Sequence, residues 1–547
     1  MTRKSFAKFN WLSLLGIAFS LTSSWLGVSS SLVAGISSGG PLLIIYGLII
    51  GVVFTLMCGL SLSEFSSMLP NASGVCFWVL KLLSEELDPD MVEKEVGKCE
   101  EEDTQEEVLE VMADGSLEDQ LDEGLLEAYC SGKNLFITKK WKKDLGIMTG
   151  LINYAGAIFT CASICASLSL SILGLYSLMH SDYELKHWHV FLTFELLNIA
   201  IAFVASWARW LPAISQFGLG ISVISYFMTF LVCIISRSLD HSEPWPSGKA
   251  IFGEFENTTG WSSKGIAFIV GLVNPLWAFA AIDSTTHMVA DVGYSTSRRL
   301  VPKTIMLTIL LGFATSFPYA IVMFFCITDT KAVAESILPI LQIYYQATGN
   351  KSLSAFMQSC CITTGFICGV SCSTWQNRIL WSVSGTYHAI ERDEMHAKKA
   401  ALVRKLGSIN PQIRIPLYAH LLSHLFVAII GCIFMGSSTA FNAVITACIS
   451  ILLLSYAIPC VIMLFVVGKK SFYRRIASEH QALQVRQEFS ESRASWYLIP
   501  NILTICWAIF CLVFLSFPYV IPVDSSNMNY VCVVYGATAI LIGIALL

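Results

Sequence analysis

Long apolar stretches are the feature that most limits how this chain can fold. Each holds about 17 residues or more, enough for an α-helix to cross the roughly 30 Å hydrocarbon layer of a membrane. Only 13% of the 547 residues are charged, whereas a typical soluble protein has about 25%. The sequence therefore predicts an all-α membrane protein rather than a water-soluble enzyme. The twelve predicted transmembrane helices are 10–34, 41–63, 145–173, 187–207, 211–236, 264–285, 303–327, 353–375, 416–434, 440–467, 495–517 and 528–547.

Acidic residues are concentrated in one segment of the chain. Residues 85–127 contain 19 of the 39 Asp and Glu side chains and only two lysines. The rest of the chain therefore has a net charge of +12, from 32 basic and 20 acidic residues. Such a charge density disfavours an independently folded domain. We expect the insert at about 84–130 to be a solvated loop extension, with a docking segment for a cytoplasmic regulatory partner, or a degradation signal, as the alternatives.

Basic residues indicate how these helices are oriented. Loops on the cytoplasmic side of a membrane carry an excess of Lys and Arg. The N-terminus and every second loop contain 28 of the 34 Lys and Arg, and the alternate loops contain six. We therefore predict that both termini are cytoplasmic. The predicted organisation is a short N-terminus at 1–9, helices 1–5 at 10–236, helices 6–10 at 264–467 and helices 11–12 at 495–547.

Three further patterns bear on the membrane setting. The first apolar stretch follows Asn10 without a small-residue cleavage site, so we expect it to be retained as a membrane anchor. The N-x-[ST] sequons at Asn257 and Asn350 fall in loops predicted outside, and the one at Asn71 falls inside. None of the 18 cysteines falls in a predicted outer loop. No disulfide framework is therefore expected.

Two of the predicted helices contain residues that interrupt a helix. The first holds a run of small, hydroxyl and glycine residues in mid-membrane, including Ser23, Ser24 and Gly27. The sixth has Pro275 at its middle and a carboxylate, Asp283, beyond it. Interrupted helices at matching positions of two halves are typical of inverted-repeat transporters, with the substrate between the breaks. Close helix packing by small residues and an ordinary proline kink are the alternative explanations.

The side chains near these breaks are aromatic and weakly anionic. Trp25 and Trp277 lie close to the two breaks, and Phe279 and Tyr154 are candidate neighbours. Aromatic faces attract cations, by about 0.5 to 2 kcal/mol each, and cages of this kind suit quaternary ammonium groups. The pattern therefore predicts a binding site for a small amine. Any one of these tryptophans is equally typical of packing or of the membrane interface.

Ionisable residues within membrane helices are costly and are functional candidates by default. Asp283 is a candidate counter-ion or proton carrier, and His287 is a candidate proton carrier one turn further on. Glu64 is a third coupling candidate, although it and Glu195 fit a structural hydrogen bond better. A packed neutral histidine is an equal alternative for His287. No metal-ligand cluster, nucleophile set or phosphate-binding glycine loop is evident, so we predict no cofactor and no nucleic-acid partner.

Several blocks of residues resemble a known family. They are Ser37-Ser-Gly-Gly-Pro41, Ser61-Leu-Ser-Glu64, Asn274-Pro-Leu-Trp277, Thr374-Trp-Gln376, Ser455-Tyr-Ala-Ile-Pro459 and Phe517-Pro518. Together they resemble the amino acid–polyamine–organocation permeases, in the fungal amino-acid and choline branch. The chain departs from the family pattern at Ala72-Ser73-Gly74, where two adjacent glycines are usual. It also departs in the loop after the eighth helix and in having the acidic insert.

The resemblance implies a fold and a function. The fold would be the leucine-transporter type, with an inverted repeat of five plus five helices and broken helices 1 and 6. The function would be plasma-membrane import of choline, with ethanolamine as a further substrate, by alternating access with proton coupling as an option. Two alternatives remain open: an amino-acid or γ-aminobutyrate permease of the same superfamily, and a nutrient sensor that kept the fold without transport.

Overall fold

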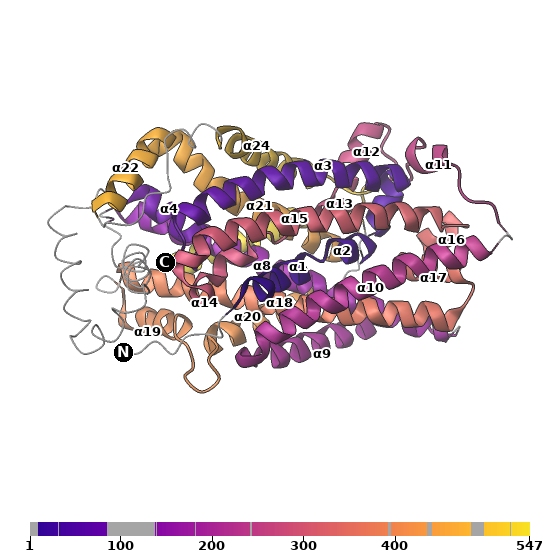
Figure 1. Ribbon diagram of the computed structural model, residues 1–547, viewed down its shortest axis with the longest axis horizontal. Coiled ribbons are helices and arrows are strands. Elements are labelled where there is room, and N and C mark those ends of the chain that lie inside the picture. The colour runs from indigo at the N-terminus through magenta and orange to yellow at the C-terminus, as the bar shows by residue number, and fades with distance from the viewer. Residues whose placement is uncertain are drawn as a thin grey trace, which may run out of the picture.

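The chain folds into an elongated bundle of helices (Figure 1). The computed structural model describes residues 9–30, 32–84, 137, 139–180, 182–240, 243–391, 395–434, 440–482, 497–525 and 527–547. Every regular element within these ranges is a helix, so the predicted all-α class is confirmed. The acidic insert falls almost wholly outside the described residues, and its predicted role is not tested.

Eight helical segments in the described part of the chain are long and apolar enough to cross a membrane. They are α1–α2 (Trp11–Thr22 and Ser24–Ser30), α3 (Leu32–Met68), α8 (Lys140–Met179), α9 (His187–Ala205), α10 (Leu211–Leu239), α15 (Tyr294–Phe325), α18 (Lys351–Glu391) and α21 (Ala440–Val461) with the π-helix Ile462–Val467. Shorter apolar helices occupy the other four predicted positions: α12–α13 (Lys264–Gly271 and Val273–Trp277), α20 (Leu417–Phe434), α24 (Leu498–Phe514) and α25 (Val531–Leu546).

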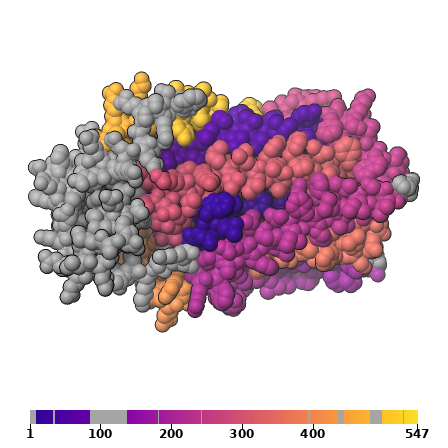
Figure 2. Space-filling model, in the orientation of Figure 1, coloured from indigo at the N-terminus to yellow at the C-terminus, as the bar shows by residue number. Residues whose placement is uncertain are grey.

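Short helices lie at the two ends of the bundle (Figure 1). At one end, which we call the α22 end, are α4 (Val75–Leu83), α14 (Val289–Val292), α19 (Ala397–Leu406) and α22 (Lys469–Ala482). At the other, the α16 end, are α11 (Gly248–Phe252), α16 (Thr330–Glu335) and α17 (Pro339–Thr348). The C-terminus lies at the α22 end (Figure 1). Between the ends, side chains of α10 and α15 border those of the first helix on the face seen in Figure 2.

A turn within α3 separates the end of the first apolar stretch from the second. Gly39 and Gly40 leave helical geometry, and Gly40 has a φ of 68°. This left-handed conformation is open to glycine at little cost because it has no Cβ. Pro41 then begins the long straight part of α3, as a proline can at the start of a helix. The second apolar stretch therefore begins where the sequence predicted it.

A buried ion pair holds α22 against the bundle. The Lys469 ammonium lies 2.9 Å from one carboxylate oxygen of Glu64 in α3, and both side chains are almost fully buried. The Asn501 amide donates to the same carboxylate at 2.8 Å, and the Tyr473 hydroxyl donates to it as well. A buried charge is tolerated when it is paired and its remaining acceptor sites are satisfied. Glu64 therefore joins three helices at the α22 end, consistent with the structural role that the sequence favoured for it.

Further polar contacts close the α22 end between α18 and its neighbours. The Arg378 guanidinium donates to Asp291 at 3.0 Å, and both side chains are buried. The Ser382 hydroxyl donates to the Ala72 carbonyl oxygen at 2.9 Å. Gly74, which remains from the altered glycine pair, has a φ of 51° and leaves no room for a Cβ, since that atom would lie 2.8 Å from the imidazole of His287. The retained glycine is thus needed for close packing here.

Replacement of Glu64 by Gln should destabilise the protein strongly. It leaves the Lys469 ammonium buried without a counter-charge, and breaking a buried pair costs about 3 to 5 kcal/mol. The matched control is Glu335→Gln, because the Lys331–Glu335 pair is 3.8 Å apart with both side chains mostly exposed, and such pairs contribute about 0 to 1 kcal/mol. Melting of the purified protein in detergent checks the prediction; equal melting temperatures for the two variants would contradict it.

Candidate substrate site

Both predicted helix interruptions are present, and they face each other. The first helix ends at Thr22, Ser23 adopts the left-handed region with φ 31° and ψ 53°, and α2 starts at the next residue. The second break follows Trp277, where residues 278–283 leave helical geometry before a 3₁₀ turn at Ser284–Met288. A Cβ on Gly27 would lie only 3.0 Å from the Cα of Ala278. The two interrupted helices are therefore in direct contact at their breaks.

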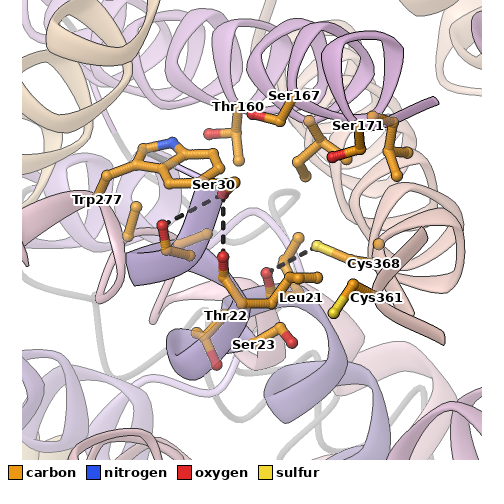
Figure 3. A pocket seen from close by; sticks show the side chains of 17 residues that line it. Leu21, Thr22, Ser23, Ser30, Thr160, Ser167, Ser171, Trp277, Cys361 and Cys368 are labelled. Atoms are coloured by element: carbon orange, nitrogen blue, oxygen red, sulfur yellow. Dashed lines mark hydrogen bonds between the residues drawn. The ribbon is translucent and has the colours of Figure 1, made fainter. Parts of the chain in front are cut away.

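A cavity lies beside this contact. Figure 3 shows its wall: the hydroxyl side chains of α8 and the indole of Trp277 lie across from the residues of the first break, with two α18 cysteines on a third side. We call it the central cavity. On α8 it reaches from Thr160 to Ser171, toward the α16 end, while the contacts of Glu64 and Arg378 close the opposite end. The cavity thus occupies the half of the bundle on the α16 side of the breaks.

The wall of the central cavity is mostly apolar, with hydroxyl groups at several positions, and it carries no Asp, Glu, Lys, Arg or His side chain. Thr160, Ser167 and Ser171 follow one another along one face of α8, at spacings that bring residues onto the same side of a helix. The hydroxyls of Ser23 and Ser167 are buried and have no hydrogen-bond partner among the described residues. A buried hydroxyl without a partner costs about 1 to 3 kcal/mol. These two groups are therefore free to donate to, or accept from, a ligand.

Backbone strain is concentrated at the same place. Ser23 and Ala281 both line the cavity, and both have positive φ angles, 31° and 62°. A non-glycine residue in this region costs of the order of 1 to 3 kcal/mol, and such residues cluster at functional sites. The strain is explained by the breaks, where backbone N–H and C=O groups face the cavity instead of forming hydrogen bonds within a helix. This arrangement is suited to holding a small solute.

Three predicted site residues line the central cavity: Ser23, Gly27 and Trp277. Trp25 lies elsewhere, although it is close to the same break in sequence. Its indole nitrogen donates to Ser222 at 3.1 Å, and its ring packs edge-on against Tyr319 at 5.4 Å between ring centroids. Ser24 is buried against Gly312. The two tryptophans therefore do not form one aromatic cage.

Tyr154 and Phe279 also lie outside the central cavity wall. The Tyr154 hydroxyl is 2.8 Å from that of Ser423 in α20. Phe279 lines a second, more apolar cavity of about 370 Å³ between α3, α21 and α24. Ala280 and Ala281 line both cavities, so only the interrupted segment separates them.

Asp283 is buried in a polar cluster behind the cavity. It accepts hydrogen bonds from the Asn153 amide at 2.9 Å and the Tyr456 hydroxyl at 2.5 Å. The Nε2 of His287 is 3.4 Å from the same carboxyl group, and its Nδ1 is 2.8 Å from the Ala72 carbonyl oxygen. A carbonyl oxygen can only accept, so Nδ1 carries a hydrogen. The Nε2 atom has no hydrogen-bond partner among the described residues, although it lies beside this carboxyl group.

Sequence reasoning missed the hydroxyl row on α8 and the cysteines of α18. Cys361 and Cys368 line the central cavity, and the thiol of Cys368 donates to the Leu21 carbonyl oxygen at 3.1 Å. A repeat of Ser and Thr along one face of an otherwise apolar helix is the signal that would have identified Thr160, Ser167 and Ser171. It was hidden by the many other small residues of α8.

Comparison with known proteins places this chain among transporters. The family model described as "Amino acid permease" matches residues 131–538. A Saccharomyces cerevisiae "7-keto 8-aminopelargonic acid transporter" is 52% identical, over 98% of this chain and 91% of that protein. The "Choline transporter" of the same yeast is 38% identical, over 97% and 79%. A "Putative amino acid/polyamine transporter" of Macrophomina phaseolina is 24% identical, over 94% and 96%.

Trp277→Ala and Trp25→Phe should have separable effects. Loss of the cavity-lining ring should raise the KM for an ammonium-bearing solute about two- to thirtyfold, which corresponds to about 0.5 to 2 kcal/mol. Trp25→Phe removes the hydrogen bond to Ser222 and part of a fully buried ring, so it should lower stability by about 1 to 3 kcal/mol and leave the KM unchanged. Uptake kinetics and melting curves of both variants test this. The reverse pattern would place the site at Trp25.

Proposed function

This chain belongs to the amino acid permease family, and from that premise we propose that it imports a small amine-bearing carboxylic acid across the plasma membrane. It is a membrane transporter rather than an enzyme. The first candidate substrate is 7-keto-8-aminopelargonic acid, because the relative of that name is 52% identical over nearly the whole chain. The observation that carries the substrate class is the central cavity, whose wall is rich in hydroxyls and lacks an ionisable Asp, Glu, Lys, Arg or His side chain.

The charge of the substrate supports this choice. An amino acid with separate ammonium and carboxylate groups has no net charge, so it needs no counter-charge in the wall of the cavity. Its ammonium, ketone and carboxylate are strong hydrogen-bonding groups, and Ser23 and Ser167 offer hydroxyls without other partners. Burying polar groups is tolerated when each finds such a partner. The cavity therefore matches a neutral zwitterion better than a permanent ion.

Choline is the second candidate. Trp277 offers one aromatic face in the cavity wall, and a relative named as a choline transporter is 38% identical. A single ring contributes about 0.5 to 2 kcal/mol to holding a quaternary ammonium. A nutrient sensor would bind its solute without accumulating it, so a measurement of accumulation distinguishes the sensor alternative from both transport candidates.

We further propose that the twelve apolar helices form the inverted repeat of five plus five helices, with α1–α2 and α12–α13 as the matching broken helices. Both termini would then be cytoplasmic. The α22 end would face the cytoplasm and the central cavity would open from outside. Alternating access would require the contacts of Glu64 and Arg378 at the α22 end to separate.

The driving force distinguishes the two substrate candidates. A permanent cation gains about 2.3 kcal/mol per 100 mV of inside-negative potential, whereas a zwitterion gains nothing unless a cation travels with it. Concentrative uptake of a zwitterion therefore needs a coupled ion. A proton carried by Asp283, whose carboxyl group lies 3.4 Å from the Nε2 of His287, is the candidate for it.

Competition for uptake tests the substrate. In proteoliposomes, the uptake of labelled 7-keto-8-aminopelargonic acid should be inhibited by the unlabelled compound at a concentration at least tenfold lower than by choline or γ-aminobutyrate. Uptake driven by an imposed potential alone should be small, because the substrate has no net charge. If choline competes best and potential alone drives accumulation, the zwitterion proposal is wrong and choline is the substrate.

Asp283→Asn tests the coupling proton. The variant keeps an oxygen that accepts from Tyr456, but its amide cannot take up and release a proton as a carboxyl group does. Proton-driven accumulation should be lost, while exchange of labelled for unlabelled substrate without a gradient should persist. Asp329→Asn, at the exposed N-cap of α16, is the matched control. Unchanged proton-driven accumulation in the Asp283 variant would exclude this carboxylate as the carrier.

A further inference from the structure

Two histidines form a buried cluster away from the central cavity, in a region that the sequence did not single out. His420 and His424 lie one turn apart on α20, and their rings meet edge-on with centroids 4.7 Å apart. Both are buried, with 3% and 7% of their surface exposed. Their ring nitrogens contact α9 and α18. Four nitrogens with four defined partners allow the protonation state of each ring to be derived.

His420 is satisfied as a neutral ring. Its Nε2 lies 3.1 Å from the carbonyl oxygen of Ala202, which can only accept, so this nitrogen carries a hydrogen. Its Nδ1 lies 2.6 Å from the Nδ2 of Asn377, an amide group that can only donate. The Nδ1 therefore accepts. A second proton on this ring would set two donors against each other.

His424 is satisfied in the same way. The Asn198 amide donates from Nδ2 to the His424 carbonyl oxygen at 3.1 Å, which leaves its Oδ1 to accept from His424 Nδ1 at 2.7 Å. The Nε2 of His424 is 2.7 Å from the hydroxyl oxygen of Ser373. With a hydrogen already on Nδ1, the neutral ring accepts at Nε2 from the serine.

One acceptor in this network has no donor. The Nδ2 of Asn377 also lies 3.5 Å from the Ser373 hydroxyl, so a continuous chain runs from His424 through Ser373 and Asn377 to His420. The Oδ1 of Asn377 is buried and has no hydrogen-bond partner among the described residues. An unmade hydrogen bond at a buried group costs about 1 to 3 kcal/mol. The neutral network is therefore one donor short.

We propose that His420, His424, Ser373 and Asn377 form a binding site for one proton, and that its occupancy sets the pH dependence of transport. A proton on Nδ1 of His420 is donated to the Oδ1 of Asn377 once the amide turns over, and the Nδ2 group then takes the position that Oδ1 has left. A proton on Nε2 of His424 is accepted by the Ser373 hydroxyl, which rotates toward Asn377. Two protons are excluded because the rings are 4.7 Å apart and two like charges would repel. The two orientations of the Asn377 amide thus correspond to the two protonation states.

The described residues around the site include a carboxyl group, a thiol, a phenol and a paired guanidinium. On α9, the carboxyl group of Glu195 neighbours Asn198. On α8, the thiol of Cys161 faces His424, and the Tyr154 hydroxyl bonds to Ser423. On α18, the next residue after Asn377 is Arg378, whose guanidinium is paired with Asp291. A change at Asn377 therefore occurs beside a contact that closes the α22 end.

The pH profile of substrate exchange without a gradient tests the site and rests on the proposed transport function. It is measured between about pH 4 and 8, because burial disfavours the charged form of a histidine. The double variant His420→Gln/His424→Gln, in full-length reconstituted protein, should lose the pH step of this exchange, with the rate varying less than about twofold over this range. His180→Gln removes an exposed histidine and should keep the wild-type profile. A double variant with the wild-type profile would overturn the proposal.

A second measurement needs no substrate, so it separates this proposal from the proposed function. The melting temperature of purified wild-type protein should depend on pH over the same range differently from that of the double variant, whereas His180→Gln should keep the wild-type dependence. If the double variant does not fold, Asn377→Asp replaces it: an added carboxylate stabilises the imidazolium, so the step should move to higher pH by at least about one unit. An unmoved step would equally overturn the proposal.

Discussion

The bundle depends on one contact, the close approach of two helices at the points where each is interrupted. Backbone groups released from a helix need partners in an apolar setting. Here the absence of a side chain at Gly27 allows α2 to lie against Ala278, and the Asn274 amide donates to the Val28 carbonyl oxygen at 3.4 Å. Because the two breaks support each other, the strained residues Ser23 and Ala281 can be held at the edge of a cavity. The solute site follows from this contact rather than from any single side chain.

Charge is kept away from that cavity by pairing. The Glu64–Lys469 pair, the Asp291–Arg378 pair and Asp283 with its donors all lie outside the cavity wall. Each pairing satisfies a group whose burial alone would cost several kcal/mol. The cavity wall is left with aliphatic side chains, hydroxyls, thiols and one indole. Recognition there must work through neutral hydrogen bonds and shape, which favours solutes that balance their own charges.

The sequence predicted the class of fold and the places of the breaks because both depend on local composition. Small residues and Pro275 weaken a helix wherever they stand, so the first break falls within the predicted run of small residues, at Ser23, while the second follows Trp277 and leaves Pro275 inside α13. The sequence could not separate Trp277 from Trp25, since the face that each presents depends on which helix packs against it. The same limit hid His420, whose ring contacts residues that are distant in the sequence. Ser167 was missed for another reason, because its repeat with Thr160 and Ser171 is obscured by the other small residues of α8.

In the proposed mechanism, the interrupted segment would also link the solute to the coupling proton. Residues 278–283 begin at the end of the helix that carries Trp277, line the cavity at Ala280 and Ala281, and end at Asp283. Any shift of this segment when the cavity fills must change how Asp283 sits between Tyr456 and His287. Coupling between two bound ligands is reciprocal, so a proton that favours one arrangement changes solute affinity by the same factor. The membrane potential cannot drive a solute that has no net charge, so concentrative uptake of such a solute needs coupling to an ion. In the proposed mechanism, the few residues between the cavity and Asp283 would provide this coupling.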